Sequence, residues 1–262
     1  MSNKEVVVSE RVGDLMVISM NHPPFNLLGP VLLGGIMKAM KQAANDGARA
    51  ILLKSALKHF SAGADLEVFA VSEDNNEKKG KNSTSPLSFL SFMSEFPLPV
   101  VASVQGAVLG GGLEVALACD IIIAARSSRI GAVETTLGLA PVMGGVQRMV
   151  ERIGLARAKE FAMLGRRHDP EEMERIGLIN LVVADNDLED VSVNYAQQLA
   201  NGPSIALGAI KKIANLMAEK GLNEADQQMA AIMSAVLTSE DVKLGIQEFQ
   251  KSGPGTAVFE GK

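Results

Sequence analysis

The chain has 262 residues, of which 47% are hydrophobic and 21% charged, and its formal net charge is −5. This length and balance are typical of a soluble globular protein with a substantial core. An acidic chain with one tyrosine and no tryptophan is a poor partner for nucleic acid, one cysteine cannot form an internal disulfide, and three scattered histidines predict no metal site.

The first residues carry charges where a signal peptide needs an apolar core, so we expect a cytoplasmic protein. Two short β-rich runs, 5–8 and 15–20, flank Gly13-Asp14 and predict a hairpin. Apolar residues at helical spacing behind a proline predict a helix over 30–45. A buried strand is expected over 48–55.

The segment 71–86 is polar, charged and nearly free of large apolar residues. Such a composition predicts a loop. We expect this loop to be disordered without ligand and to close over a bound ligand.

No charged residue occurs from Phe96 to Leu113, yet this run does not predict a membrane span because prolines, glycines and polar residues interrupt it. It predicts instead a buried strand over 99–104, a connection over 105–109 and a helix from Gly111. A further core strand is expected over 120–125, and a shorter one in "SSRIGAVE".

After Gly144, apolar residues recur every three to four positions. Strands and helices interleave before this point and helices dominate after it, which predicts an α/β domain over 1–200 and a helical C-terminal region over 201–262. The helices are expected over 144–152, 155–163, 170–176, 187–200, 203–219, 222–238 and 240–251.

Three consecutive glycines, Gly110 to Gly112, stand between the strand over 99–104 and the helix that follows it, and Glu114 comes next among apolar residues. Glycines let a ligand approach the backbone closely, and the first N–H groups of a helix are free to bind an anion or a developing oxyanion. Taken alone, the segment is equally consistent with a packing turn and an acid that stabilises a helix start.

A second segment, "HFSAGADLEVF", follows the strand over 48–55 in the same way, with small residues before Asp65 and an apolar helical pattern. Two such turns could direct two backbone N–H donors at one oxygen, as an enolate or tetrahedral oxyanion requires. In a third segment, Glu134 lies among apolar residues before another glycine pair. Apolar surroundings raise the pKa of carboxyl groups and suit Glu114 and Glu134 to acid–base work, although Glu134 is also consistent with a surface acid.

The motifs "HFSAGADL", "SVQGAVLGGGLEVALACDIIIAA" and "AVETTLGLAPVMGGVQRM" resemble those of the crotonase (enoyl-CoA hydratase/isomerase) superfamily, and the likeness covers essentially the whole chain. The resemblance implies an α/β spiral of ββα units with a helical C-terminal trimerisation region. It also implies a coenzyme A thioester substrate, with no cofactor beyond the coenzyme A that the substrate carries.

The resemblance assigns roles residue by residue. The backbone N–H groups of Ala64 and Gly111 would form the oxyanion hole, Glu114 would activate water, and Glu134 would transfer the proton at C2. The substrate-binding residues it implies are Ala62, Gly63, Asp65, Leu66, Gly110, Leu137, Gly138 and Lys251.

This sequence departs from the family pattern at three places. Gln105 replaces an asparagine, Leu27 replaces an alanine and could narrow the acyl pocket, and the basic C-terminal cluster is reduced to Lys251. Both glutamates are present, which favours hydration of 2-enoyl thioesters. The alternatives are a Δ3,Δ2-enoyl-CoA isomerase, another crotonase-type lyase or hydrolase, and a non-catalytic scaffold that binds acyl-CoA or associates with RNA.

The C-terminal helices carry apolar residues on more than one face, which is consistent either with an intermolecular surface or with a layer folded on its own core. The resemblance favours the first, so we expect a homotrimer or a hexamer made of two trimers. No membrane contact is expected.

Overall fold

The computed structural model describes residues 5–66 and 85–262. Its main sheet has the strand order β1-β2-β3-β4-β6-β8, in which β1 pairs antiparallel with β2 and every other neighbouring pair is parallel. This arrangement confirms the predicted α/β fold. The strands are β1 (Val7–Val12), β2 (Leu15–Met20), β3 (Ala50–Ser55), β4 (Val100–Val104), β6 (Ile121–Ala125) and β8 (Leu181–Val183).

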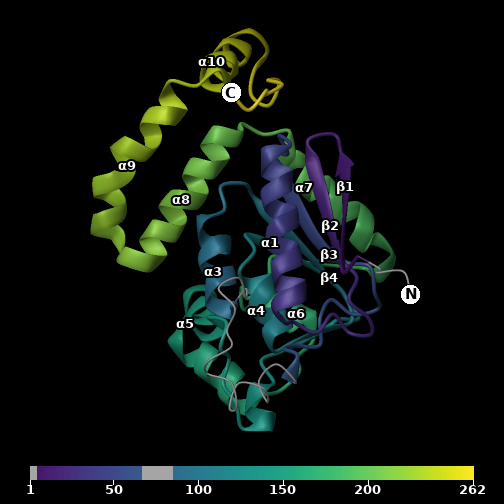
Figure 1. Ribbon diagram of the computed structural model, residues 1–262. Helices are drawn as coiled ribbons and strands as arrows, with labels where there is room; N and C mark the ends of the chain where they lie inside the picture. The colour runs from purple at the N-terminus through teal and green to yellow at the C-terminus, as the bar shows by residue number, and fades with distance from the viewer. Residues whose placement is uncertain (1–4, 67–84) are drawn as a thin grey trace, which may run out of the picture.

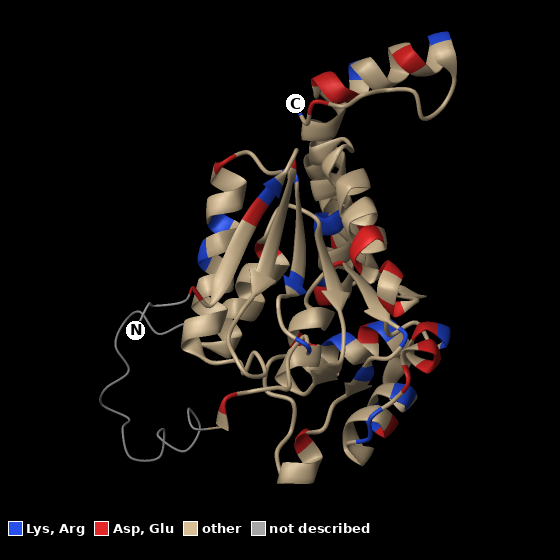
Figure 2. Ribbon diagram, turned by 90° about the vertical axis from the view of Figure 1, so that its right-hand side faces the viewer, with Lys and Arg blue, Asp and Glu red and all other residues tan. Residues whose placement is uncertain are grey.

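Alternate side chains of the central strands enter two separate cores, one on each face of the sheet. Ile51 and Leu53 of β3 join the larger core, whereas Leu52 joins the smaller one. Successive side chains of a strand point to opposite faces, so a strand buried on both faces is apolar throughout. In Figure 2 the central strands are almost entirely free of charged residues, which lie mainly on the outer helices.

Helices cover both faces of the sheet (Figure 1). The larger core is shared with α1 (Pro30–Asn45), α3 (Pro86–Glu95), α4 (Gly111–Leu117) and α5 (Gly145–Leu164), and the smaller one with α7 (Leu188–Ala200). Chain reversals between these layers are completed by α6 (Pro170–Arg175) and two short 3₁₀ helices, η1 (Glu134–Leu137) and η2 (Asp185–Asp187).

Several element boundaries differ from those predicted. The first strand lies over Val7–Val12 rather than 5–8, and the connection predicted over 105–109 contains β5 (Ala107–Leu109), which pairs in parallel with β7 (Arg129–Gly131) in a second sheet. By contrast, the two helices predicted over 144–152 and 155–163 are present: they form the two segments of α5, which meet at Gly154, whose φ is +76°. The sequence interpretation missed α3 and β8. The loop predicted over 71–86 lies mainly outside the described residues.

The last three helices, α8 (Ser204–Lys220), α9 (Leu222–Leu237) and α10 (Glu240–Ser252), form an arm that projects from the sheet (Figure 1). The predicted boundary at residue 200 falls in the link between α7 and α8. Within the described residues, no helix combines the length and the apolar character needed to cross a membrane.

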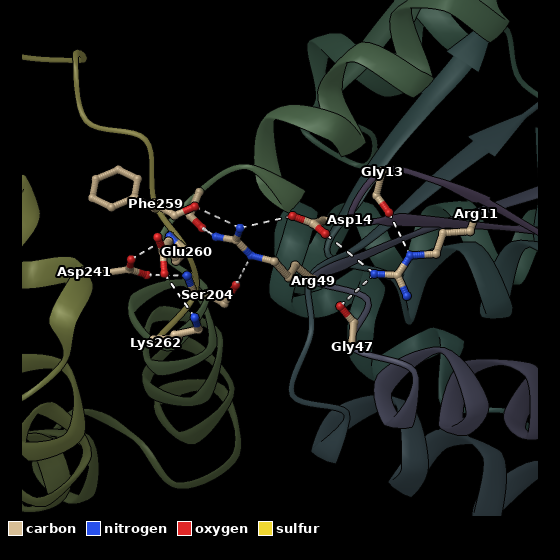
Figure 3. Close-up of polar contacts among 12 residues, drawn as sticks. Arg11, Gly13, Asp14, Gly47, Arg49, Ser204, Asp241, Phe259, Glu260 and Lys262 are labelled. Carbon is tan, nitrogen blue, oxygen red and sulfur yellow. Dashed lines mark hydrogen bonds and ion pairs between the residues drawn. The ribbon is translucent and has the colours of Figure 1, made fainter.

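Arg49 joins this arm to the sheet (Figure 3). Its guanidinium donates to Ser204 Oγ at 2.9 Å and to the carbonyl oxygens of Gly202 and Phe259, and it forms an ion pair with Asp14 at 3.3 Å. The planar donor fork of arginine suits several acceptors held in fixed directions. One side chain therefore connects the β1–β2 turn, the start of α8 and the C-terminal tail.

The tail is fixed at its other side by Asp241, a residue of α10 that is 3% exposed. Its carboxylate accepts the N–H of Glu260 at 2.8 Å and that of Gly261 at 2.9 Å (Figure 3). Its own N–H donates to the carbonyl oxygen of Lys262 at 3.0 Å. A buried carboxylate is stable when backbone N–H groups satisfy it, so the tail and α10 support each other.

Candidate active site

The two small-residue turns meet because the first runs alongside β5, which leads into the second. Ser61 donates its N–H to the carbonyl oxygen of Ala107 and its carbonyl oxygen accepts the N–H of Leu109, each at 3.1 Å. A Cβ on Gly112 would lie 2.7 Å from Ser61, so only glycine permits this approach. The two small-residue turns thus lie side by side in the fold.

Ala64 and Gly111 lie next to each other where the two turns meet. Leu28 forms a parallel bridge with Ala64, donating to the carbonyl of Gly63 and accepting the N–H of Asp65, so the N–H of Ala64 points to the opposite side. Gly111 is the first residue of α4, where an N–H has no partner within the helix. A Cβ built on Gly111 would lie 3.5 Å from the nitrogen of Ala64. The nitrogen of Ala64 therefore lies close to Gly111, as is required of two backbone donors that bind one oxygen.

Glu114 lies in the first turn of α4 and is 3% exposed. Its Oε1 accepts the N–H groups of Met143 and Gly145, both at 2.8 Å. Burial raises the pKa of Glu114 to about 7, an effect that the backbone hydrogen bonds oppose and the nearby charge of Glu134 increases. A carboxyl group with this pKa can hold or release a proton near neutral pH.

Glu134 begins η1 and faces the second turn. A Cβ on Gly110 would lie 3.3 Å from Oε1 of Glu134. Both of its carboxylate oxygens are buried and accept no hydrogen bond from the described part of the chain, and burial raises its pKa. A buried acid without a protein partner is available to a bound molecule.

The remaining predicted binding residues fall into two groups. Ala62, Gly63, Asp65, Leu66 and Gly110 accompany the two turns, while Leu137 and Gly138 end η1, where Leu137 is 59% exposed. Lys251 lies apart from them, in α10 at the far end of the arm, and its side chain is 76% exposed (Figure 1).

Sequence reasoning missed Asn26, whose hydrogen bonds hold the first turn in place. Asn26 is fully buried at φ +50°, and its amide nitrogen donates to Ser55 Oγ at 2.8 Å and to the carbonyl of Phe60 at 3.0 Å. Its own carbonyl accepts the hydroxyl of Ser61 at 2.7 Å. A non-glycine residue with positive φ was the structural signal, and it is not visible in the sequence.

Met143 was also missed, because its contribution depends on the fold. Its N–H holds Glu114, and a Cβ on Gly111 would lie 3.6 Å from its Sδ. The side chain is 2% exposed. Gln105, noted as a departure from the family pattern, donates to the carbonyls of Leu57 at 2.9 Å and Ser55 at 3.2 Å and so fixes the loop after β3.

The described residues contain no group of three or more histidine, cysteine or acidic side chains that could hold a metal ion. A cavity of about 910 Å³ at the carboxyl ends of β3 and β4 is lined by Lys58 and Arg167, among others, and by neither glutamate. The chemical groups that Glu114, Glu134, Ala64 and Gly111 offer are two carboxyl groups and two backbone N–H donors.

Residues 10–260 match the profile of the family described as Enoyl-CoA hydratase/isomerase. The chain belongs to this family. The fold observed is that of the crotonase superfamily.

Individual family members resemble the chain along most of its length. A probable enoyl-CoA hydratase of Rhizobium meliloti (strain 1021) is 32% identical over 94% of this chain and 95% of its own. A crystal structure of enoyl-CoA hydratase from Bacillus anthracis superposes with a TM-score of 0.88 at 30% identity, covering 98% of this chain and 100% of that one.

A mitochondrial enoyl-CoA hydratase domain-containing protein 2 of Mus musculus is 39% identical over 70% of this chain, and this match spans 62% of the mouse protein. The family name covers both hydratases and isomerases. It supports an enzyme that acts on coenzyme A thioesters.

Proposed function

We propose that the chain is an enoyl-CoA hydratase, which adds water reversibly and syn to a 2-enoyl-CoA thioester. The observation that carries this proposal is the pair of buried carboxyl groups, Glu114 and Glu134, beside the second turn, where Gly111 lies close to Ala64 of the first turn. Hydration needs both a base and an acid at adjacent carbons, whereas isomerisation needs one group that moves a proton.

The thioester carbonyl oxygen binds between the N–H groups of Ala64 and Gly111. Their partial positive charge makes C3 electrophilic and stabilises the enolate that forms when C3 is attacked. Loss of one such donor in other enzymes costs about 2.7–4 kcal/mol of barrier, so these two donors are expected to be major contributors.

The two glutamates supply the proton transfers. Glu114 takes a proton from water as the water oxygen bonds to C3, and Glu134 gives its proton to C2 as the enolate collapses. Burial raises the pKa of both carboxyl groups, which brings them closer to the range in which they exchange protons at neutral pH. The product is a 3-hydroxyacyl thioester, and the reaction requires no further cofactor.

The test is turnover of crotonyl-CoA, followed by loss of enone absorbance, with the product identified by mass. Glu114→Gln and Glu134→Gln are each expected to lower kcat by about 10²–10⁴-fold with the fold retained. Near-normal turnover by both variants would refute the assigned roles. A 3-enoyl thioester run in parallel tests the isomerase alternative: conversion to the 2-enoyl isomer without hydration would favour it.

The proposed assembly is a homotrimer or a hexamer. Large apolar side chains of the arm remain exposed, including Ile210 at 63%, Leu237 at 67% and Phe249 at 61%. Exposed apolar surface on three successive helices is typical of an intermolecular contact. In such an assembly Phe249 and Lys251 would approach the site of a second copy. Light scattering at micromolar concentration measures the mass, and a monomer would overturn this proposal.

A further inference from the structure

The space in front of Gly111 is enclosed by two apolar side chains. A Cβ built on Gly111 would lie 3.2 Å from Cδ1 of Leu28 and 3.6 Å from Sδ of Met143, on the same side as the nitrogen of Ala64. From the sequence, Leu27 is expected to narrow the acyl pocket. Leu28 is the one that faces Gly111, and it is 4% exposed.

Both side chains are held in place by the core behind them. Leu28 and Met143 belong to the larger core, and Leu90 of α3 closes against Gly144, beside Met143. Packing at the density of a protein interior leaves little room for side chains to withdraw. The two residues therefore act as a fixed wall.

The wall lies where the reacting carbons of a substrate must lie. The carbonyl oxygen binds at the N–H groups of Ala64 and Gly111, and the carbon attacked by water lies beside Glu114, which the N–H of Met143 holds. C2 would lie between these points, next to the space in front of Gly111 that Leu28 and Met143 enclose. A hydrogen at C2 fits there, whereas a methyl group at C2 requires the volume that Cδ1 and Sδ occupy.

We propose that Leu28 and Met143 determine substrate specificity, restricting the enzyme to 2-enoyl thioesters without a branch at C2. This inference rests on the proposed hydratase function. One methylene group in an apolar pocket changes specificity by about 10 to 200-fold. The wild-type enzyme is therefore expected to prefer crotonyl-CoA over 2-methylcrotonyl-CoA by at least about tenfold in kcat/KM.

The test compares this ratio in Met143→Ala, Leu28→Val and Met143→Leu. Met143→Ala removes the side chain beyond Cβ and is expected to lower the preference by about tenfold, and Leu28→Val is expected to lower it less. Met143→Leu preserves volume and is the matched control, expected to keep the ratio. Equal turnover of the two substrates by the wild type, or an unchanged ratio in both shortened variants, would overturn the proposal.

A binding measurement separates this inference from the proposed reaction. Calorimetry with butyryl-CoA and 2-methylbutyryl-CoA, which cannot be hydrated, is expected to show the same preference and the same loss of it in Met143→Ala. If crotonyl-CoA is not turned over but this binding preference is present, the hydratase function is contradicted and the exclusion of a C2 branch by Leu28 and Met143 is supported. Equal affinities of the wild type for butyryl-CoA and 2-methylbutyryl-CoA would contradict the proposed role of Leu28 and Met143, whether or not crotonyl-CoA is turned over.

Discussion

Gly145 lies directly against the carboxyl group of Glu114, and its N–H donates to Oε1 at 2.8 Å. A Cβ at residue 145 would lie 2.8 Å from Cγ and 2.9 Å from Oε1 of this glutamate. Gly145 therefore donates a hydrogen bond to the carboxyl group of Glu114, and its lack of a side chain leaves the space that this carboxyl group occupies.

Gly145→Ala is expected to displace the carboxyl group and lower kcat for crotonyl-CoA hydration by about 10²-fold, because small misplacements of a catalytic group have effects of that size. Gly245→Ala, in α10, is the matched control: its Cβ would meet only the ring of Phe259, at 3.3 Å. Steady-state kinetics on both variants, with circular dichroism to confirm folding, decide the matter. Full activity in Gly145→Ala would be inconsistent with the role of Glu114.

Glu114 also lowers stability at high pH. Burial raises its pKa in the folded protein from the ordinary 4.5 to about 7, so between these values the folded state holds a proton that the unfolded state has released. Stability therefore falls as pH rises from about 4.5 to about 7, by up to about 3 kcal/mol. Glu114→Gln is expected to unfold at a higher temperature than the wild type at pH 8, with little difference at pH 4.5. An equal difference at both pH values would contradict this account.

Asn26 is expected to be a major stabilising residue. In Asn26→Asp, a carboxylate replaces the amide that donates to Ser55 Oγ and to the carbonyl of Phe60, and places a charge against acceptors. The expected loss is about 3 kcal/mol in urea denaturation, since buried groups left unpaired have costs of this order. Asn194→Asp, on the exposed surface of α7, is the matched control and is expected to change stability by about 0.5 kcal/mol or less.

Arg49→Lys tests the attachment of the arm. Lysine keeps the positive charge but lacks the planar guanidinium that donates to Gly202, Ser204 and Phe259. The variant is therefore expected to have a lower free energy of unfolding. In limited proteolysis it is expected to be cleaved faster near the start of α8. Arg157→Lys is the control, because this exposed residue forms a surface pair with Glu160. Identical cleavage rates in the two variants would argue against an anchoring role.

Cys119 provides a probe of unfolding. Its thiol is 2% exposed, and burial raises its pKa to about 12. Because the thiolate is the reactive form, iodoacetamide at pH 8 is expected to leave the folded protein unmodified and to label it fully in denaturant. Mass spectrometry after brief exposure measures this. Rapid labelling of the native protein would show that the surroundings of Cys119 open readily.

The sequence was sufficient to predict elements whose patterns extend over a full strand or helix. Buried strands such as 120–125 and helices such as 240–251 show continuous apolar runs or helical spacing, and the structure confirms them. Strands β5 and β8 have three residues each and were missed, whereas β7, which is equally short, was expected within "SSRIGAVE". Their strand form results from pairing with distant segments.

Site residues could be predicted where they belong to one continuous motif. They could not be predicted where the fold brings together residues that are distant in sequence. Gly111 and Glu114 share one helix start, which the glycine run indicates. The contacts of Asn26 with Phe60 and of Met143 with Glu114 join residues about 30 positions apart, and nothing in their own neighbourhoods marks them. Such residues emerge only when the chain is folded, because their side chains act on groups supplied by other elements.

The bond from Arg49 to the carbonyl of Phe259 joins residues 210 positions apart. All described strands of the sheet are complete in sequence by Val183, so a chain synthesised from its N-terminus can form the sheet before the acceptor of this bond has been made. The arm is therefore anchored late, after a loop closure of unusual length. A second copy that binds the arm during synthesis would meet helices whose position relative to the sheet has not yet been set.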